Sequence, residues 1–504
     1  MKAYLKQDVQ AIYNQLIQKS QRNVSKSQWG KALKYIEAAA TWEYNFNAIY
    51  YDEKAEHLLK VISENNVKVV EIENPINTRC VYLDSWCVDN RGLSQQYLRA
   101  MISIGMDILY ITVADSLKGG NELLRELKEY KKATIVTYER SRLSPFDKAI
   151  DIRNKIADYS PKHLFLHMLP WETTLLMACY SVKGVLKYNI NLTDHAFWLG
   201  ASFIDYNLEF RPYGVTVSEE KRRLTPKQLI VLPYYPITPK RTEFQGLPSL
   251  PKDSVLIFTG GALYKMLGKD NIFFQIMDSI LDISPKVFII VAGFNRDKIF
   301  DDRCATMKHG NRIVQIGVRS DIDEVFDNVD IYLGTYPMMG GLMSQYAAKH
   351  GLPIISYHDK GDAMNYVEEM VNQYQNEYKS YSNIYEIVEY ATKLIMDTDF
   401  RKSEGKKLQS GIMTEARFAL EFNQLISTHE NHWNLGRDCI DYDSFLERYL
   451  DLEKTNGFKS TMQLVRTLKS DVLTIATKRT NMIQALWILT IKKIANSLMG
   501  VDNI

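Results

Sequence analysis

The sequence contains no long hydrophobic run and no strong excess of charge of either sign. No apolar stretch reaches the ~18 residues that a membrane-spanning helix needs, and the first residues, MKAYLKQDVQ, lack the apolar core of a secretion signal. The formal net charge of +2 does not indicate nucleic-acid binding. These absences predict a cytoplasmic protein without a nucleic-acid partner. Hydrophobic residues make up 46% of the 504 residues, which is typical of a folded chain with several domains.

Cysteine is scarce and scattered. The five cysteines have no motif spacing: Cys80, Cys87, Cys179, Cys304 and Cys439. Neither a zinc site nor a CxxC redox pair fits this spacing, so we expect reduced thiols. The segment 321–323 has an Asp-x-Asp pattern, but it opens an expected helix and does not follow a strand. The sequence therefore predicts no metal site.

The pattern of apolar residues changes along the chain. In the first 66 residues, Leu5, Val9, Ile12 and Leu16 recur at three- and four-residue spacing, which predicts helices. Short apolar runs then alternate with helical patterns, which is typical of doubly wound parallel sheets. Five of the 14 prolines fall in residues 233–251, as in an extended linker. We predict these regions: helices in 1–66, Rossmann-like domains in 67–240 and 250–425, and a helical tail in 426–504.

Residues 330–356, DIYLGTYPMMGGLMSQYAAKHGLPIIS, have the pattern of a strand, a glycine turn, a helix and a second strand. Gly351 is suited to end the helix, and Pro353 prevents its continuation. The pair Gly340-Gly341 would leave bare backbone N–H groups and a helix N-terminus at the carboxyl end of a sheet. Phosphates bind at such places. The same residues would also suit an ordinary turn that binds no ligand.

A second glycine turn follows another predicted strand. Residues 255–258 are apolar, and Thr259-Gly260-Gly261 and then Leu263-Tyr264-Lys265 come after them. A lysine at a glycine-rich strand end is suited to neutralise two phosphates. The sequence thus predicts two turns that together hold a diphosphate.

These motifs resemble the nucleotide-binding half of GT-B glycosyltransferases. The closest likeness is to the O-GlcNAc-transferase/SPINDLY branch, through the LYK triplet and a Trp198-Leu199-Gly200 segment followed by Asp205-Tyr206. The broad group of bacterial retaining GT-B enzymes comes second. The resemblance implies an α/β fold with two Rossmann-like domains facing a cleft and helical additions at both ends. It also implies metal-independent transfer of a sugar from a UDP-linked donor, without a further cofactor, to a hydroxyl of a protein, glycan or lipid-linked acceptor.

The resemblance also implies which residues hold the donor. Carried over to this sequence, they are Gly260, Gly261, Tyr264, Lys265, Gly293, Val318, Arg319, Gly340, Gly341, Leu342, Met343, Ser344 and Tyr346. Tyr346 stands where the family has an acidic residue that binds ribose hydroxyls. A phenol can bind a hydroxyl, but the charge-assisted hydrogen bond is lost.

The change at Tyr346 leaves three interpretations open. We favour an active glycosyltransferase, because Gly260, Lys265, Gly340 and Gly341 remain together. The first alternative is a catalytically silent GT-B subunit that supports a partner glycosyltransferase. The second is an epimerase or another enzyme that acts on nucleotide sugars.

His195 and Asp194 are the predicted catalytic residues. They precede the WLG segment and follow an apolar strand-like run, so we expect them at the cleft. Histidine is the natural general base near neutral pH, and it would deprotonate the acceptor hydroxyl in an inverting reaction. A single histidine is more often structural, and His167, at the end of another predicted strand, is the alternative.

The terminal segments suggest partners. Residues 29–47 resemble one helix of a tetratricopeptide pair, which would form an acceptor-side arm or only pack on the next domain. Near the C-terminus, Trp487, Ile491, Ile494 and Leu498 share one face of a basic helix. Such a helix would lie peripherally on an anionic membrane, bind a second copy or a partner subunit, or pack on the N-terminal helices. We favour packing.

Overall fold

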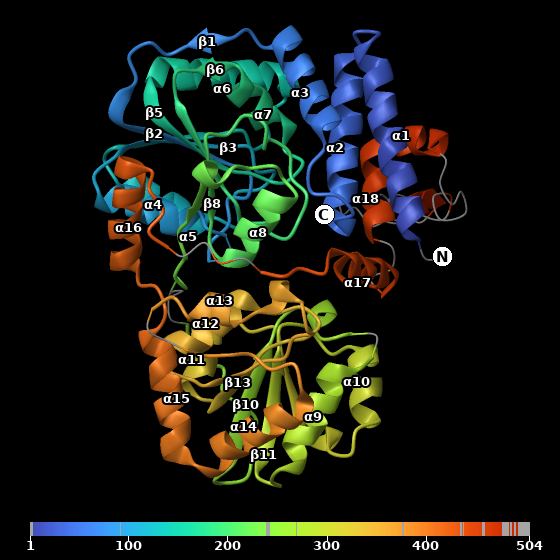
Figure 1. The fold of residues 1–504 in the computed structure, drawn as a ribbon, viewed down its shortest axis with the longest axis vertical. Helices are drawn as coiled ribbons and strands as arrows, with labels where there is room; N and C mark the ends of the chain where they lie inside the picture. Colours follow the sequence, from blue (N-terminus) through green and yellow to red (C-terminus); the bar gives the residue numbers. More distant parts are fainter. Residues whose placement is uncertain are drawn as a thin grey trace.

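The computed structural model contains two parallel sheets, one above the other in Figure 1, with helices from both chain ends beside the first. It describes residues 4–90, 92–237, 242–268, 270–374, 377–433, 436, 438–455, 459–475, 483, 486–487 and 490–491. Helices and strands alternate through both sheet domains, as the apolar pattern predicted.

Seven of the described strands form the first sheet, in the order β4-β3-β2-β5-β7-β8-β9, and neighbouring strands are parallel. Their bounds are β2 Ile76–Asp84, β3 Asp107–Thr112, β4 Ala133–Thr137, β5 Pro161–His167, β7 Leu186–Ile190, β8 Tyr206–Glu209 and β9 Leu229–Val231. Two short strands pair beside this sheet: β1 Val70–Glu71 and β6 Val182–Lys183. The inner strands are buried because helices cover both faces of a parallel sheet.

The helices that cover the first sheet begin at favourable residues. Ser144 caps one of them with its side chain, and Glu172 caps another. These helices are α4 Ser94–Ser103, α5 Asn121–Glu129, α6 Pro145–Tyr159, α7 Thr173–Tyr180 and α8 Pro212–Glu220.

Five of the described strands form the second sheet, in the order β12-β11-β10-β13-β14, again all parallel. Their bounds are β10 Val255–Gly260, β11 Val287–Ala292, β12 Ile313–Gly317, β13 Ile331–Leu333 and β14 Ile354–Ile355. The strand order reverses between β10 and β13, and between β2 and β5 in the first sheet. Both sheets therefore have the Rossmann-like, doubly wound arrangement, in which ligands bind beyond the carboxyl ends of the strands at this reversal.

Further helices pack around the second sheet. They are α9 Ile272–Asp282, α10 Lys298–Ala305, α11 Ile322–Asp327, α12 Gly341–Lys349, α13 Glu368–Val371, α14 Ile384–Met396 and α15 Thr398–Ser410. Short 3-10 helices occur in both domains and near the C-terminus: η1 Pro226–Gln228, η2 Leu263–Lys265, η3 Gly310–Arg312, η4 Ala363–Asn365 and η5 Lys469–Thr474.

One helix returns from the second domain to the first. α16, Glu415–Thr428, packs on α4, where the ring centroid of Tyr97 lies 5.2 Å from that of Phe418 and 5.8 Å from that of Phe422. α16 therefore connects the end of the second domain to the first domain.

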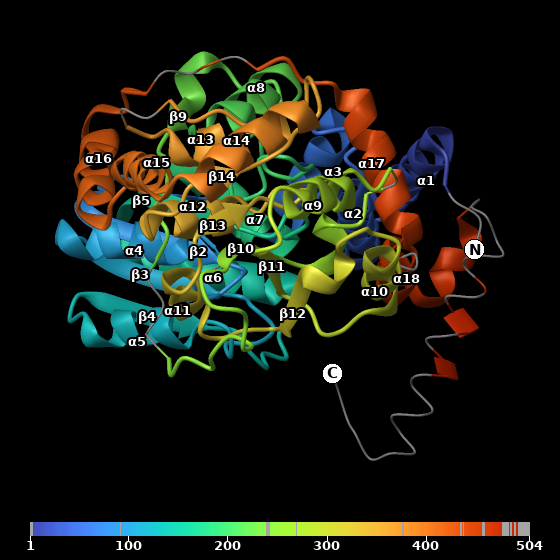
Figure 2. The same cartoon turned by 90° about the horizontal axis from the view of Figure 1, so that it is seen from below.

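The two chain ends pack together beside the first domain. The N-terminal helices are α1 Lys6–Val24, α2 Trp29–Phe46 and α3 Glu53–Asn66, and the C-terminal helices are α17 Tyr442–Thr455 and α18 Lys459–Leu468. Figure 2 shows α17 and α18 beside α1 and α2. The Asn45 amide donates to the Gln463 side chain at 2.8 Å, and the Tyr4 and Thr461 hydroxyls lie 2.9 Å apart.

The described part of the tail thus packs on the N-terminal helices. The predicted basic helix near the end lies mostly outside the described residues, and Trp487, which is described, is exposed. Among the described residues, no helix is both long enough and apolar enough to cross a lipid bilayer.

The linker between the domains is held to the second domain by side chains. The carbonyl of Ile237 accepts from the Tyr346 hydroxyl at 2.7 Å, and the carbonyl of Gly246 accepts from Arg319 at 2.9 Å. Residues 238–241 of the predicted linker lie outside the described residues. These contacts fix where the chain enters the second domain.

We predict that Leu464→Ala lowers the free energy of unfolding by about 2–5 kcal/mol, the usual cost of a cavity in a core. Leu464 on α18 is 2% exposed and shares its core with Leu33 and Ile36 of α2. Leu420→Ala is the matched control, because Leu420 is 71% exposed. Urea unfolding measures both. Equal, small effects would mean that α18 does not pack on the N-terminal helices.

Candidate functional site

The carboxyl ends of the two sheets face each other across a cavity of about 200 Å³. Segments that follow β7 and β8 line one wall, and segments that follow β10 and β13 line the other. Its polar and backbone lining includes Asp194, His195, Arg211, Tyr264, Lys265, Met339, Gly341 and Asn365. The second wall lies at the reversal of strand order, where α/β sheets bind their ligands.

Lys265 is a partly buried cation that has no acidic partner among the described residues. Its ammonium donates to the carbonyl of Met339 at 3.1 Å, and no carboxylate of the described residues pairs with it. Burial lowers the pKa of Lys265, because the protonated form loses hydration. An anion in the cavity would restore that lost stabilisation.

The N-terminus of α12 is open to the same cavity. Gly341 and Leu342 line it, and in the described structure no side chain caps this end of the helix. Backbone N–H groups at a helix start carry partial positive charge and favour anions. This helix start and Lys265 therefore favour the same kind of ligand.

The turn before α12 is held by side chains from two directions. Asn365 accepts from the Met339 N–H at 2.8 Å and donates to the carbonyl of Pro337 at 2.8 Å. Arg448 of α17 also donates to the carbonyl of Pro337, at 3.1 Å, and to Asp362 at 2.8 Å. The turn is thereby fixed before any ligand binds.

On the opposite wall, Asp194 lies between Arg211 and His195. The Arg211 Nε lies 2.5 Å from the Asp194 carboxylate, and Nδ1 of His195 lies 3.2 Å from it. Burial acts to raise the pKa of Asp194, but Arg211 and the hydrogen bond to His195 outweigh it and lower the pKa to about 2. Asp194 is therefore an anion that orients His195, and it is a poor base itself. The His195 side chain is 32% exposed.

Arg211 also joins the two domains. Its Nη1 donates to the carbonyl of Met364 in the second domain at 2.9 Å. The orientation of His195 is thus linked to the contact between the domains. No sequence signal marked Arg211 beyond its place between a strand and a helix that begins with Pro212.

Some predicted donor residues form the backbone behind the cavity. A Cβ atom at Gly293 would lie 2.4 Å from the carbonyl oxygen of Gly261, and the φ of Gly293 is +108°, so the close approach of these two turns requires glycine at position 293. Met343 packs near Gly260, and Ser344 is buried and donates to the carbonyl of Gly340 at 3.3 Å.

Nine of the thirteen predicted donor residues do not line this cavity: Gly260, Gly261, Gly293, Gly340, Met343 and Ser344, and also Val318, Arg319 and Tyr346. Val318 is 63% exposed, and Arg319 pairs with Asp321 and the linker. Tyr346 is buried, and its hydroxyl is engaged by the linker carbonyl of Ile237.

His167, the alternative base, is fully buried. Its Nδ1 lies 3.1 Å from the Asp84 carboxylate and 2.9 Å from the Ser94 hydroxyl, and it does not line the cavity. Within the described residues, no cluster of three His, Cys, Asp or Glu side chains could hold a metal ion.

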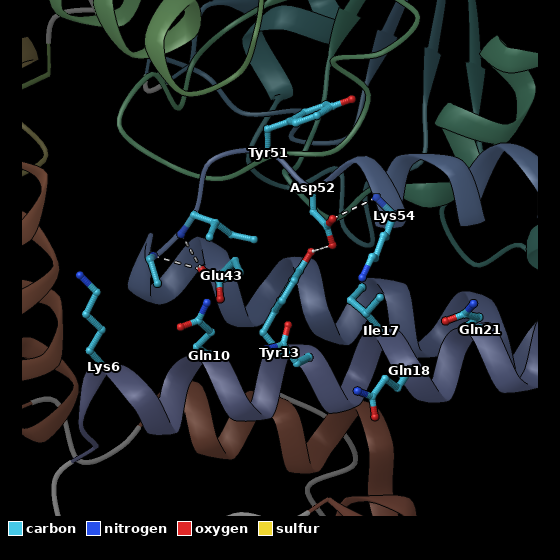
Figure 3. Close-up of a pocket in the computed structure, with 13 residues that line it drawn as sticks. Lys6, Gln10, Tyr13, Ile17, Gln18, Gln21, Glu43, Tyr51, Asp52 and Lys54 are labelled. Atoms are coloured by element: carbon cyan, nitrogen blue, oxygen red, sulfur yellow. Dashed lines mark hydrogen bonds between the residues drawn. The ribbon is translucent and has the colours of Figure 1, made fainter.

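A larger cavity, of about 510 Å³, lies on the N-terminal helices and shares no lining residue with the cavity between the sheets (Figure 3). Its acidic groups already have partners. Tyr13 donates to Asp52 at 2.7 Å, and Glu43 accepts from the backbone N–H groups of Ala48 and Ile49. The lining of this larger cavity therefore gives no indication of a catalytic site.

We predict that Tyr346→Phe costs about 1 kcal/mol of folding stability, the net value of a buried hydrogen bond. The lost bond is the one to the linker, so nucleotide affinity should stay unchanged. Thermal unfolding and calorimetric titration with UDP measure the two effects. A clear loss of UDP affinity with unchanged stability would instead place the phenol at the ligand.

No protein-family model and no curated protein matches this sequence. Among solved structures, the chain is similar to a mutant of the Thermobaculum terrenum O-GlcNAc transferase, with a TM-score of 0.52 and 13% identity over 89% of this chain and 85% of that one. Anabaena HepE in complex with UDP aligns with a TM-score of 0.49 and 13% identity, over 69% of this chain and 100% of that one. A glycosyltransferase from Rickettsia africae aligns with a TM-score of 0.48 and 13% identity, over 70% of this chain and 100% of that one. The first of these likenesses confirms the predicted architecture: the chain has the GT-B fold, with helical additions at both ends.

Proposed function

We propose that this protein is a glycosyltransferase that moves a sugar from a nucleoside-diphosphate sugar, with UDP as the expected nucleotide, to an acceptor hydroxyl. One observation carries the proposal. Lys265, a partly buried cation that no carboxylate of the described residues pairs with, and the open N-terminus of α12 line the same cavity as His195.

The role of the donor-side residues follows from the charge that the reaction creates. As the bond between sugar and diphosphate breaks, negative charge builds on the leaving diphosphate. Lys265 and the N–H groups at Gly341 and Leu342 would stabilise that charge from fixed positions, which is electrostatic catalysis by preorganised groups. These groups would supply the charge that a metal ion supplies elsewhere, and this is why metal independence remains our prediction.

The residues that would activate the acceptor lie on the opposite wall of the cavity, in the first domain. His195 would take the proton of the attacking hydroxyl, and the Asp194 anion would stabilise the imidazolium that forms. Arg211 keeps Asp194 ionised and in place. A cavity of about 200 Å³ lies below the about 300–1,000 Å³ typical of ligand sites, so we expect the domains to separate when a whole nucleotide sugar enters.

A second candidate function is a GT-B subunit that binds no donor and supports a partner enzyme. Tyr346 favours it, because the family's acidic residue is missing and the phenol is engaged by the linker. Calorimetric titration with UDP and GDP separates the two functions. The enzyme should bind UDP and slowly hydrolyse a UDP-sugar without acceptor, and the silent subunit should do neither.

Lys265→Ala should weaken UDP binding by about 1.5–3 kcal/mol, the range for a hydrogen bond to a charged group, which is about 10- to 150-fold in Kd. Lys286→Ala is the matched control, because this exposed lysine precedes β11 at the other end of the sheet. Calorimetry measures both. Equal affinities for wild type and Lys265→Ala would remove this lysine from the donor site.

His195→Ala should lower the rate of sugar transfer by about 10²–10⁴-fold, the usual contribution of a general base, and leave UDP affinity near that of the wild type. His309→Ala serves as a control, because His309 pairs with Asp282 far from the cavity lining. Radiolabelled transfer assays and calorimetry distinguish rate from binding. Undiminished transfer would exclude His195 as the base.

A further inference from the structure

A second cavity, of about 410 Å³, adjoins the first. The two share His195, Tyr264 and Met338. The chain ends supply the rest of its wall: Tyr44 and Asn45 from α2, Tyr449, Leu452 and Glu453 from α17, and Lys459 and Ser460 from α18. The cavity therefore extends from His195, the proposed base, into a space that the helices of the two chain ends help to enclose.

Three tyrosines meet in this second cavity. Tyr44, Tyr264 and Tyr449 all line it, and burial raises the pKa of Tyr449. The Tyr449 hydroxyl is buried and has no hydrogen-bond partner in the described structure. Tyr44 is braced by an edge contact with Trp171, at 5.2 Å between ring centroids. Braced rings and one unsatisfied hydroxyl are features of a ligand site.

The polar side chains of the second cavity are also held in place. Glu453 accepts from the Ser460 hydroxyl at 2.6 Å and from the Thr461 N–H at 3.2 Å. Asn45 is bonded to Gln463 and to the carbonyl of Thr41, both at 2.8 Å. Fixed polar groups around aromatic rings can bind selectively a ligand that has both hydroxyls and an apolar face.

We infer that the second cavity is the acceptor site and that the acceptor it binds is a sugar unit of a glycan. This inference rests on the proposed function. A sugar ring offers an apolar C–H face to tyrosine rings and several hydroxyls to the surrounding amide and carboxylate, and one of these hydroxyls would reach His195. The lining also contains Asn45, Glu453 and Lys459, whose polar groups would lose hydration without compensation against a lipid chain.

The C-terminal helices then serve both substrates. Arg448 of α17 holds the turn at Pro337 on the donor side, and the next residue, Tyr449, lines the acceptor cavity. Part of α18 closes the same cavity through Lys459 and Ser460. Packing on α2 alone does not explain why residues of the tail line the same cavity as His195.

The test uses the full chain with UDP and the p-nitrophenyl β-glycosides of glucose, galactose and N-acetylglucosamine as acceptor probes. Ligand-observed NMR should detect binding of at least one glycoside to the wild type. Lys459→Trp should abolish this binding by filling the cavity. Lys454→Trp, at an exposed lysine of α17 outside the cavity, should keep it. Tyr449→Phe should raise the acceptor KM about three- to tenfold in a transfer assay.

The outcomes separate the acceptor inference from the proposed function. Calorimetry with UDP on the same variants reports the donor site, and its affinity should be equal in all of them. Glycoside binding that survives Lys459→Trp, or a wild type that binds no glycoside and transfers only to peptides or polyprenyl phosphates, would overturn the acceptor inference and leave the donor site standing. A wild type that binds glycosides but not UDP would overturn the proposed transferase instead.

Discussion

The buried pairing of Arg211 with Asp194 is the interaction on which the arrangement of this site depends. Burying two charges costs several kcal/mol per ion unless both are well paired. Here the guanidinium meets the carboxylate through two nitrogens, and Arg222 also donates to the carbonyl of Asp194 at 2.8 Å. The same guanidinium binds the second domain through Met364. One network thus fixes the charge of Asp194, the position of His195 and the contact between the sheets.

The second domain contributes the complementary half. Its strand order reverses between β10 and β13, so the segments after these strands lie side by side and bring Lys265 next to the start of α12. Close contact between the turns at Gly261 and Gly293 leaves no room for a side chain at Gly293. The first domain therefore presents a charge pair, and the second presents Lys265, which pairs with no carboxylate of the described residues. This asymmetry favours an anionic ligand on the second domain.

The chain ends complete the cleft from the side. α18 packs on α2, and Arg448 of α17 reaches the turn at Pro337. Segments more than 400 residues apart in the sequence therefore line one cavity, as the lining by Tyr44 and Tyr449 shows. The helical additions are part of the architecture of the site as well as of its stability.

The sequence by itself determined the features that depend on neighbouring residues. Alternating apolar runs predicted two parallel sheets, the glycine pairs predicted the turns at the strand ends, and the LYK triplet placed Lys265 beside them. His195 and Lys265 were predicted from local patterns as residues that follow strands, and they line one cavity because the carboxyl ends of the two sheets face each other.

Only the tertiary structure decided which side chains are free to meet a ligand. Tyr346 is engaged by the linker more than 100 residues earlier in the chain, and Arg319 by Asp321 and Gly246. The pairing of Arg211 with Asp194 and the approach of Arg448 to Pro337 join different elements, and no short-range pattern records them. Local sequence sets where elements begin and end, because backbone preferences act over a few residues. The partners of a buried polar group depend on how distant elements pack, because packing decides which donors and acceptors lose contact with water.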